Sequence, residues 1–137
     1  IMAILISGSS GFLGKKLINY FSKELNYEIY LISNKRKNFK NFINVKEINN
    51  DKLISKFKNK IKFVFHLATI YSTKDSIEKN VYEVNYLYSI KVYEFSKKIN
   101  SKYFFNICTI LSPSVNYYSY TKNLFKEYLK SDKRKKM

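Results

Sequence analysis

Tyr118 and Lys122 are four residues apart near the end of this 137-residue chain. Residues at this spacing lie on one face of a helix, so the Lys122 ammonium can sit beside the Tyr118 phenol and lower its pKa from about 10 toward neutrality. A phenolate with such a pKa can take a proton from a hydroxyl group and return it. The pair therefore indicates acid–base chemistry. Because the chain contains 13 tyrosines, the alternative is an ordinary helix surface.

The only glycines of the chain, Gly8, Gly11 and Gly14, form a second candidate site. They follow a short apolar run and precede an amphipathic segment, which is the strand–turn–helix setting of a pyrophosphate-binding loop. Gly8 permits a tight turn, Gly11 lets backbone amides approach a phosphate, and Gly14 allows the helix to lie close to the sheet. The helix N-terminus then faces the phosphate charge. The alternative is a glycine-rich turn without a ligand.

The elements that must position these residues alternate between strands and helices. Apolar periodicity predicts strands at 3–6, 28–33, 43–48, 61–66 and 102–108, and helices at 12–25, 51–57, 77–100 and 117–129. We expect the first helix to bury Leu13, Leu17, Ile18, Phe21 and Leu25, and the longest helix to bury Ile77, Val81, Val84, Tyr88, Val92, Phe95 and Ile99. The alternation predicts an α/β fold with a parallel sheet of about five strands and right-handed crossovers.

Composition narrows the possible functions. The formal net charge is +16, but every one of the 26 basic residues except Arg36 and Arg134 is lysine, which suits base readout poorly. We interpret the charge as compositional background rather than as a nucleic-acid interface. Cys108 is the only cysteine, so the sequence predicts neither disulfides nor a metal cluster. No apolar run reaches the roughly 20 residues of a membrane span. We expect a soluble, cytoplasmic protein.

Three motifs follow one another along the chain: Gly8-x-x-Gly11-Phe12-Leu13-Gly14, then Phe65-His66-Leu67-Ala68, then Tyr118-x-x-x-Lys122 with Thr121 before the lysine and Glu127 after it. Together they resemble the extended short-chain dehydrogenase/reductases, the NAD-dependent epimerase/dehydratase proteins that act mostly on nucleotide sugars. The resemblance implies a Rossmann-type, doubly wound domain over residues 1–130 and a basic tail over 131–137. It also implies hydride transfer with nicotinamide, in which Tyr118 is the acid/base and Lys122 its partner.

The resemblance also implies roles for individual residues. Thr109 would hydrogen-bond the reacting oxygen. Asn85 would lie beside the cofactor, and the alternative for it is an exposed helix asparagine. Further implied cofactor contacts are Gly8, Ser10, Gly11, Phe12, Leu13 and Gly14 at the pyrophosphate, Glu47 and Ile48 at the adenine, Leu67, Ala68 and Thr69 near the ribose and pyrophosphate, and Tyr118 and Lys122 themselves.

The chain departs from the family pattern in three places. Ser33 ends the second strand where the family has an acidic residue, and Asn34, Lys35 and Arg36 follow, which favours NADP over NAD. Ile110-Leu111-Ser112-Pro113 follows Thr109 in place of the family's Val-Tyr-Gly. Family members are also about twice as long, so the resemblance implies that the chain is truncated after the Tyr–Lys helix and that the substrate-binding lobe is absent.

Two functions remain open. The first is an NAD(P)-dependent epimerase, dehydratase or reductase domain for nucleotide sugars, of which the 137-residue chain alone would bind NADP(H) weakly without turnover. The second is an inactive Rossmann fragment that binds a dinucleotide or another polyanion. We also expect a homodimer through the helices 77–100 and 117–129. The expected interface residues are Tyr82, Tyr86 and Tyr93 of the first helix and Leu124, Phe125, Tyr128 and Leu129 of the second.

Overall fold

The computed structural model describes residues 3–9, 11–33, 41–71 and 77–132. Four of the expected cofactor contacts, Ser10, Asn34, Lys35 and Arg36, lie outside these residues, as does the basic tail from 133 onward. The chain forms two compact units. The first contains the described residues of Ile1–Ala68 and Lys91–Asn106, and the second those of Thr69–Ile90 and Ile107–Met137.

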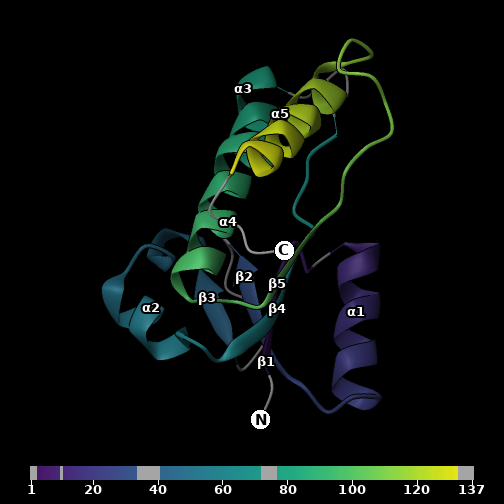
Figure 1. The fold of residues 1–137 in the computed structure, drawn as a ribbon. Helices are drawn as coiled ribbons and strands as arrows, with labels where there is room; N and C mark the ends of the chain where they lie inside the picture. Colours follow the sequence, from purple (N-terminus) through teal and green to yellow (C-terminus); the bar gives the residue numbers. More distant parts are fainter. Residues whose placement is uncertain (1–2, 10, 34–40, 72–76, 133–137) are drawn as a thin grey trace. The chain divides into compact units, whose positions relative to one another are not determined.

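The first unit is built on a five-stranded parallel sheet (Figure 1). The strands are β1 (Ala3–Ser7), β2 (Glu28–Ser33), β3 (Phe42–Asn44), β4 (Ile61–His66) and β5 (Tyr103–Asn106). Their order, β3-β2-β1-β4-β5, is that of the first five strands of a Rossmann fold. Every residue of β1 is buried because this apolar strand lies at the centre of the sheet. The α/β fold expected from the sequence is confirmed.

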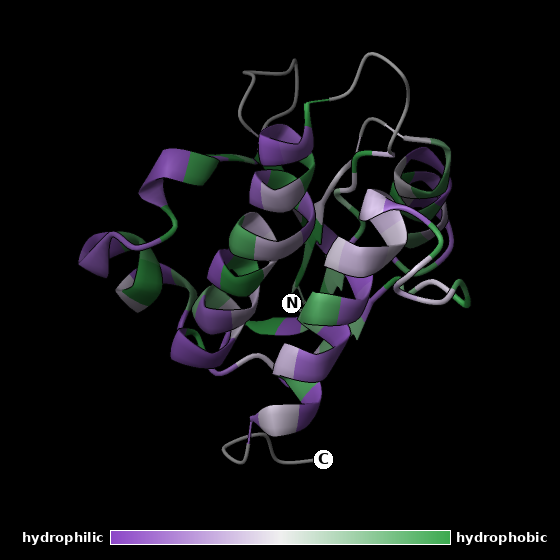
Figure 2. Ribbon diagram, turned by 90° about the horizontal axis from the view of Figure 1, so that it is seen from above, coloured by the Kyte–Doolittle hydropathy of each residue, from purple (hydrophilic) through white to green (hydrophobic). Residues whose placement is uncertain are grey.

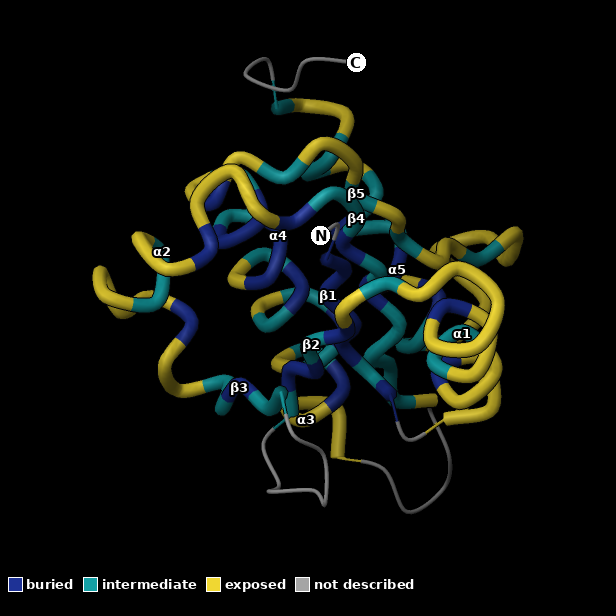
Figure 3. Tube along the Cα trace, turned by 90° about the horizontal axis from the view of Figure 1, so that it is seen from below, coloured by how far each residue is buried: buried dark blue, intermediate teal, exposed yellow. Residues whose placement is uncertain are grey.

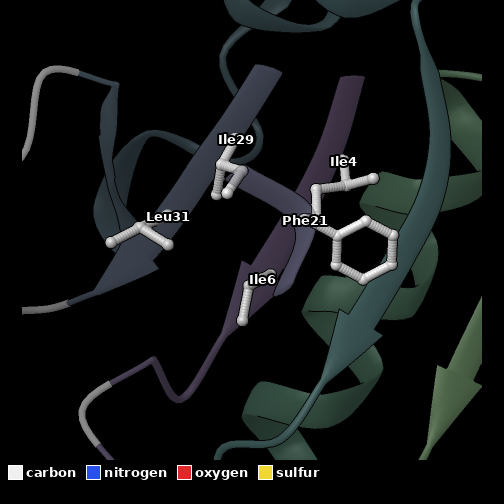
Figure 4. Close-up of a cluster of buried hydrophobic side chains, with 5 residues drawn as sticks. All are labelled: Ile4, Ile6, Phe21, Ile29 and Leu31. Carbon is white, nitrogen blue, oxygen red and sulfur yellow. The ribbon is translucent and has the colours of Figure 1, made fainter. Parts of the chain in front are cut away.

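Helices cover both faces of this sheet. On one face, Phe21 of α1 (Phe12–Lys23) packs against alternate residues of the two central strands in one cluster (Figure 4). These residues are Ile4 and Ile6 of β1 and Ile29 and Leu31 of β2. On the opposite face, Phe57 of α2 (Asp51–Phe57) packs edge-on against Tyr30, with ring centroids 4.7 Å apart. In Figure 3 the trace is buried along β1 and exposed on the outer turns of α1 and α2. This layering fixes the carboxyl end of β1, where the glycine loop begins.

Several boundaries in the first unit differ from the sequence prediction. The third strand ends at Asn44 because its side chain accepts a hydrogen bond from the Lys46 amide and starts the short 3-10 helix η1 (Val45–Glu47). The first helix ends at Lys23, and Leu13 and Leu25 are exposed rather than buried. The fifth strand, β5, spans Tyr103–Asn106 and is shorter than the predicted strand 102–108. At Asn44, a local side-chain hydrogen bond rather than apolar periodicity sets the end of the strand.

The second unit consists mainly of helices. These are α3 (Glu78–Tyr82), the π-helical segment η2 (Glu83–Tyr88), the start of α4 (Ser89–Lys98) and α5 (Tyr117–Ser131). Figure 1 shows α3 and α5 side by side. The predicted helix 77–100 is therefore interrupted by η2, whose π-helical turn is wider than an α-helical one. At the end of this wide turn, the Ser89 hydroxyl donates to the Val84 and Asn85 carbonyls.

Two residues of the predicted long helix differ from expectation in burial. Ile77, expected at the start of the apolar stripe, is the N-cap of α3 and is 63% exposed. Tyr93, expected on a free tyrosine face, is buried and packs against Phe104 with ring centroids 5.0 Å apart. A π-turn adds a residue and so rotates the following turns relative to a regular helix. The predicted stripe is wrong at Ile77. The predicted dimer face is wrong at Tyr93 and also at Phe125, which is 0% exposed.

The helices carry hydrophilic and hydrophobic residues in alternation (Figure 2). Among the residues that the structure describes, no helix is long and apolar enough to span a membrane.

Candidate active site

Gly8 turns the chain directly after β1. Its φ of +80° lies in the left-handed region that glycine adopts without strain. A Cβ on Gly8 would overlap the backbone of Ala68 and lie 2.5 Å from the Leu67 carbonyl carbon. The predicted tight turn is confirmed, and the chain after β4 leaves no room for a side chain here.

Gly11 and Gly14 have different surroundings in this loop. A Cβ on Gly14 would lie 2.7 Å from both the Gly8 oxygen and the Ser9 Cα, so the close approach that Gly14 permits is to the loop itself. A Cβ on Gly11 would meet only the Gly8 oxygen, at 3.8 Å. Gly11 is also the N-cap of α1, where no side chain caps the helix among the described residues and no acidic residue occupies the first turn. The N-terminal amides of α1 are thus available to an anion.

Ser9 carries a buried hydroxyl in the same loop. Its side chain is 5% exposed, and its Oγ has no hydrogen-bond partner in the described part of the chain. A buried hydroxyl without a partner is costly, and an oxygen-rich ligand such as a phosphate would supply one. The sequence had pointed to Ser10, its neighbour. Nothing in the order Ser9-Ser10 indicated which hydroxyl would be buried.

The segment Phe65-His66-Leu67-Ala68 supports the glycine loop from β4. His66 is fully buried, and its Nδ1 lies 2.6 Å from the Ser7 Oγ. The Leu67 amide donates to the Ser7 carbonyl over 2.9 Å, which extends the pairing of β1 with β4 by one residue. Leu67 and Ala68, expected at the cofactor, are therefore held against the turn at Gly8.

Asn85 is the centre of a hydrogen-bond network in the second unit. Its Oδ1 accepts from the Ile70 amide at 2.8 Å and from the Thr69 hydroxyl at 3.2 Å. Its Nδ2 donates to the Ile70 carbonyl at 2.8 Å and to the Thr121 Oγ1 at 3.2 Å. The side chain is 0% exposed, so the alternative of an exposed helix asparagine is wrong. These bonds use both oxygen lone pairs and both amide hydrogens, so only one orientation of the amide satisfies them.

Tyr118 and Lys122 both lie on α5, as the sequence predicted. The helix starts at a capping box, in which the Asn116 side chain accepts from the Ser119 amide at 2.7 Å and the Ser119 hydroxyl accepts from the Asn116 amide at 3.1 Å. This reciprocal pair fixes the first turn of α5. Tyr118 is in that turn, so its backbone is set by the cap.

The pKa of Tyr118 is shifted in the direction opposite to the one expected. Burial raises it above its ordinary value of 10.0, and the neighbouring Tyr71 phenol raises it further. The two rings lie against each other, with centroids 4.8 Å apart and planes at 30°. Tyr71 was not identified in the sequence, where nothing distinguishes it among the 13 tyrosines.

Lys122 is 3% exposed and makes no hydrogen bond or ion pair with any other described residue. Burial lowers its pKa from the ordinary value of 10.5, while the nearby Cys108 thiol acts in the opposite direction. A buried ammonium without a carboxylate is unfavourable for folding. Such a group is typical of a functional site, where it would receive a polar ligand.

The other expected site residues differ widely in exposure. The Thr109 Oγ1 accepts a hydrogen bond from the Leu111 amide at 3.1 Å within the loop before α5. Glu47 is exposed at the end of η1, whereas Ile48 is 1% exposed and belongs to the core. Phe12 and Leu13 are 80% and 44% exposed at the start of α1.

A pocket of about 340 Å³ lies at the amino end of the sheet, away from the glycine loop. Glu28, Tyr30 and Lys56 line it. In open parallel sheets, ligands bind at the carboxyl ends of the strands, where Gly8 and Leu67 lie. We therefore do not assign this pocket to the candidate site.

The NAD dependent epimerase/dehydratase family matches residues 4–135. The chain therefore belongs to this family, as the resemblance of its three motifs indicated. A search of curated proteins found no match.

Solved structures share the fold at low sequence identity. The enzyme WbmG from Bordetella bronchiseptica, in complex with NAD, is 23% identical with a TM-score of 0.74 over 96% of this chain and 50% of its own. WbmH from the same organism, in complex with NAD+, is 20% identical with a TM-score of 0.75 over 95% and 52%. A UDP-glucose 4-epimerase from Thermotoga maritima, with UDP-glucose, is 21% identical with a TM-score of 0.69 over 94% and 50%. The chain thus spans about half the length of these structures.

Proposed function

We propose that this chain forms the dinucleotide-binding part of an NAD(P)-dependent epimerase, dehydratase or reductase that acts on nucleotide sugars. The observation that carries the proposal is the loop Gly8–Gly14. The α1 N-terminus lacks a side-chain cap among the described residues, Gly11 leaves space beside it, and the Ser9 hydroxyl is buried without a described partner. These features fit a pyrophosphate. Two of the similar structures, WbmG and WbmH, contain NAD.

The nicotinamide of a bound cofactor would accept and return a hydride. In this proposal the chain supplies binding through Gly8, Gly11 and Gly14, with Leu67 and Ala68 alongside. Glu47 serves the adenine side together with the backbone of Ile48, whose side chain is only 1% exposed. Thr69 and Asn85, in the second unit, are proposed as further support for the cofactor. The network around Asn85 supports this part of the proposal because it fixes the backbone of Ile70 directly after Thr69.

Tyr118 is the proposed acid/base. With its pKa raised by burial, the phenol is neutral at pH 7 and is a proton donor. To act as a base it must lose its proton, and the positive charge of Lys122 would favour that loss once the two groups approach each other. Thr109 would donate a hydrogen bond to the reacting oxygen of the sugar. The test is Tyr118→Phe in an enzyme that contains this chain, which should abolish turnover and leave cofactor affinity within a few-fold.

The cofactor preference is proposed to be NADP(H) over NAD(H). Ser33 at the end of β2 offers no carboxylate to the adenosine ribose, and Asn34, Lys35 and Arg36 follow it in the sequence. Two charge-assisted contacts to a 2′-phosphate would favour NADPH by about 1 to 3 kcal/mol. Calorimetric titrations at matched salt should show tighter binding of NADPH, and Arg36→Ala should remove the difference. Equal affinities would contradict the preference.

The competing function is a Rossmann protein that binds a dinucleotide or polyanion without turnover. It predicts cofactor binding without turnover, both in the parent protein and in Tyr118→Phe, because no reaction would depend on the phenol. A turnover assay on an enzyme that contains this chain separates the two, with UDP-glucose as the first substrate to test. The choice of UDP-glucose follows the similar Thermotoga maritima epimerase.

We also propose a homodimer through residues 77–100 and 117–129. Tyr82 and Tyr86 pair with ring centroids 5.3 Å apart, and Leu87 and Tyr120 are 41% and 44% exposed. Large amphipathic side chains of this kind are common in interfaces. A dimer mass by light scattering at moderate salt supports the proposal, and a monomer mass contradicts it.

A further inference from the structure

The segment after Ala68 is held at Ile70, whose backbone amide and carbonyl both form hydrogen bonds. The Ile70 amide donates to the Asn85 Oδ1, and the Ile70 carbonyl accepts from the Asn85 Nδ2, each over 2.8 Å. A primary amide that bonds the amide and the carbonyl of the same residue imitates a neighbouring β-strand. Because Asn85 is fully buried, water does not compete for these bonds. Asn85 therefore fixes the backbone of Ile70, and with it the start of the next residue, Tyr71.

The same asparagine is bonded to α5 next to the proposed acid/base. Its Nδ2 donates to the Thr121 Oγ1 at 3.2 Å. The Thr121 hydroxyl in turn donates back along the helix to the carbonyls of Tyr118, at 2.9 Å, and Tyr117, at 3.1 Å. One side chain thus connects the backbone before Tyr71 with the helical turn that carries Tyr118.

The Tyr71 side chain lies against the phenol ring of Tyr118. Its ring centroid is 4.8 Å from that of Tyr118, with the planes at 30°, although Tyr71 itself is 64% exposed. An exposed tyrosine in open solvent would have no reason to keep one position. Here the backbone on its N-terminal side is fixed to Asn85, and the ring rests on a partner that is only partly exposed.

We propose that Tyr71 is a positioning residue for Tyr118, held in place by the Asn85 network. The ring covers one face of the Tyr118 phenol, limits its rotation and excludes water from that face. This inference rests on the proposed function, because the role of Tyr71 matters only if Tyr118 acts as the acid/base. The raised pKa of Tyr118 agrees with it, since burial is the largest cause and Tyr71 the second.

The test is the pKa of Tyr118 in the 137-residue chain, measured by NMR titration of ¹³Cζ-labelled tyrosine. The Tyr118 signal is assigned by its loss in Tyr118→Phe. Tyr71→Ala removes the covering ring and should lower the pKa of Tyr118 toward 10.0, its ordinary value. Tyr71→Phe keeps the ring and should retain most of the shift. Because Tyr71 is largely exposed, neither change should unfold the chain.

The control variant is Tyr120→Ala. Tyr120 lies on the same helix, is 44% exposed, and pairs with Tyr117 at 5.7 Å rather than with Tyr118. It should leave the pKa of Tyr118 unchanged. A second measurement tests the network itself: in Asn85→Ala the Ile70 amide should exchange its hydrogen at least about tenfold faster, whereas Tyr71→Ala should leave that exchange rate as in the parent chain.

An unchanged Tyr118 pKa in Tyr71→Ala would overturn the inference, as would an equal fall in Tyr120→Ala. Loss of the shift in Tyr71→Phe would also overturn it, because the ring would then not be the cause. None of these readouts depends on cofactor or turnover. The proposed function fails separately, through absent dinucleotide binding or persistent turnover in Tyr118→Phe.

Discussion

The two units of the chain have cores of different chemistry. In the first unit the buried side chains are mostly aliphatic and aromatic, and polar ones such as Ser7 and His66 are few. In the described part of the second unit, Val81 and Phe125 are the only buried hydrophobic residues. The buried polar residues there are Asn85, Ser89, Ser119, Thr121 and Lys122.

The apolar core of the first unit mainly stabilises the fold, whereas the polar core of the second unit mainly fixes the positions of its side chains. Apolar burial is non-directional and supplies most of the free energy of folding, so the sheet can support a loop such as Gly8–Gly14 without itself taking part in chemistry. Buried hydrogen bonds add little net stability but admit only one arrangement of their partners. The second unit uses them at Asn85, where a small displacement of α5 would move Tyr118.

The largest expected effect concerns the turn in the first unit. Gly8→Ala should lower the free energy of unfolding by about 3 kcal/mol or more, because it combines a left-handed φ of +80° with overlap of the Leu67 and Ala68 backbone. Gly11→Ala is the control: its Cβ would meet only the Gly8 oxygen at 3.8 Å, so only the weaker N-cap preference of alanine acts and stability should fall by no more than about 1 kcal/mol. Urea unfolding of both variants measures the difference, and equal losses would refute this view of the loop.

The next effect breaks the polar core. Asn85→Leu should destabilise the chain by about 2 to 3 kcal/mol, because the Ile70 amide and carbonyl lose their partners inside the protein. Asn123→Leu serves as control, since Asn123 is less buried and donates only to the Leu111 and Ser119 carbonyls. It should cost less than about 1 kcal/mol in the same unfolding assay. A neutral Asn85→Leu variant would mean that the second unit does not depend on its polar network.

Lys122→Met should act in the opposite direction. Replacing a buried ammonium by an apolar side chain of similar length should raise the free energy of unfolding by about 1 kcal/mol at pH 7 and weaken dinucleotide binding. Lys130→Met, which removes an exposed ion pair of 3.7 Å with Glu127, should change stability little. Destabilisation by Lys122→Met would show that the lysine holds the fold together.

The pH dependence of the Lys122→Met effect follows from the sign of the shift. Burial lowers the pKa of Lys122 in the folded chain below 10.5, so the unfolded chain binds the proton more tightly. Stability of the parent chain should therefore rise, relative to Lys122→Met, as the pH increases toward 10.5. The gain from Lys122→Met should shrink accordingly, and a gain that is constant with pH would contradict the assigned cause.

The smallest effect compares two tyrosines, one in each unit. Burial and a 2.6 Å hydrogen bond from the Tyr30 hydroxyl to Glu28 raise the pKa of Tyr30 to about 12. Glu28→Gln should lower that pKa and leave the pKa of Tyr118 unchanged, because Tyr71 rather than a carboxylate accompanies Tyr118. NMR titration of labelled tyrosine resolves both. A parallel change in the two residues would show that their environments are not independent.

The sequence predicted the elements whose periodicity is strong. The bounds of β2, β4 and α2 were predicted as observed, and the glycine spacing located the turn at Gly8. The end of the third strand was missed because one Asn44 hydrogen bond decides it. The π-turn was missed because the buried Asn85 and Ser89 carry no apolar signal, so the predicted apolar stripe passed through Val84 instead.

Predicting the site was easier for motifs than for their environment. Gly8, Asn85 and the helix with Tyr118 and Lys122 were located from spacing and resemblance. The direction of the Tyr118 pKa shift was wrong because it depends on burial and on Tyr71, 47 positions away along the chain and unmarked by any pattern. Ser9 was missed for a similar reason, since burial of a hydroxyl depends on the folded loop.

The most direct test of the account is calorimetric titration of the 137-residue chain with NADPH and NADH, alongside Gly11→Val. The side chain introduced by Gly11→Val would extend into the space proposed for the pyrophosphate, so this variant should keep the fold and bind the dinucleotide more weakly. The account predicts saturable binding by the parent chain, with a dissociation constant at or below about 1 mM, and at least about tenfold weaker binding by Gly11→Val. Saturable binding of equal strength in both chains, or none in the parent chain, would contradict a dinucleotide site at Gly8–Gly14.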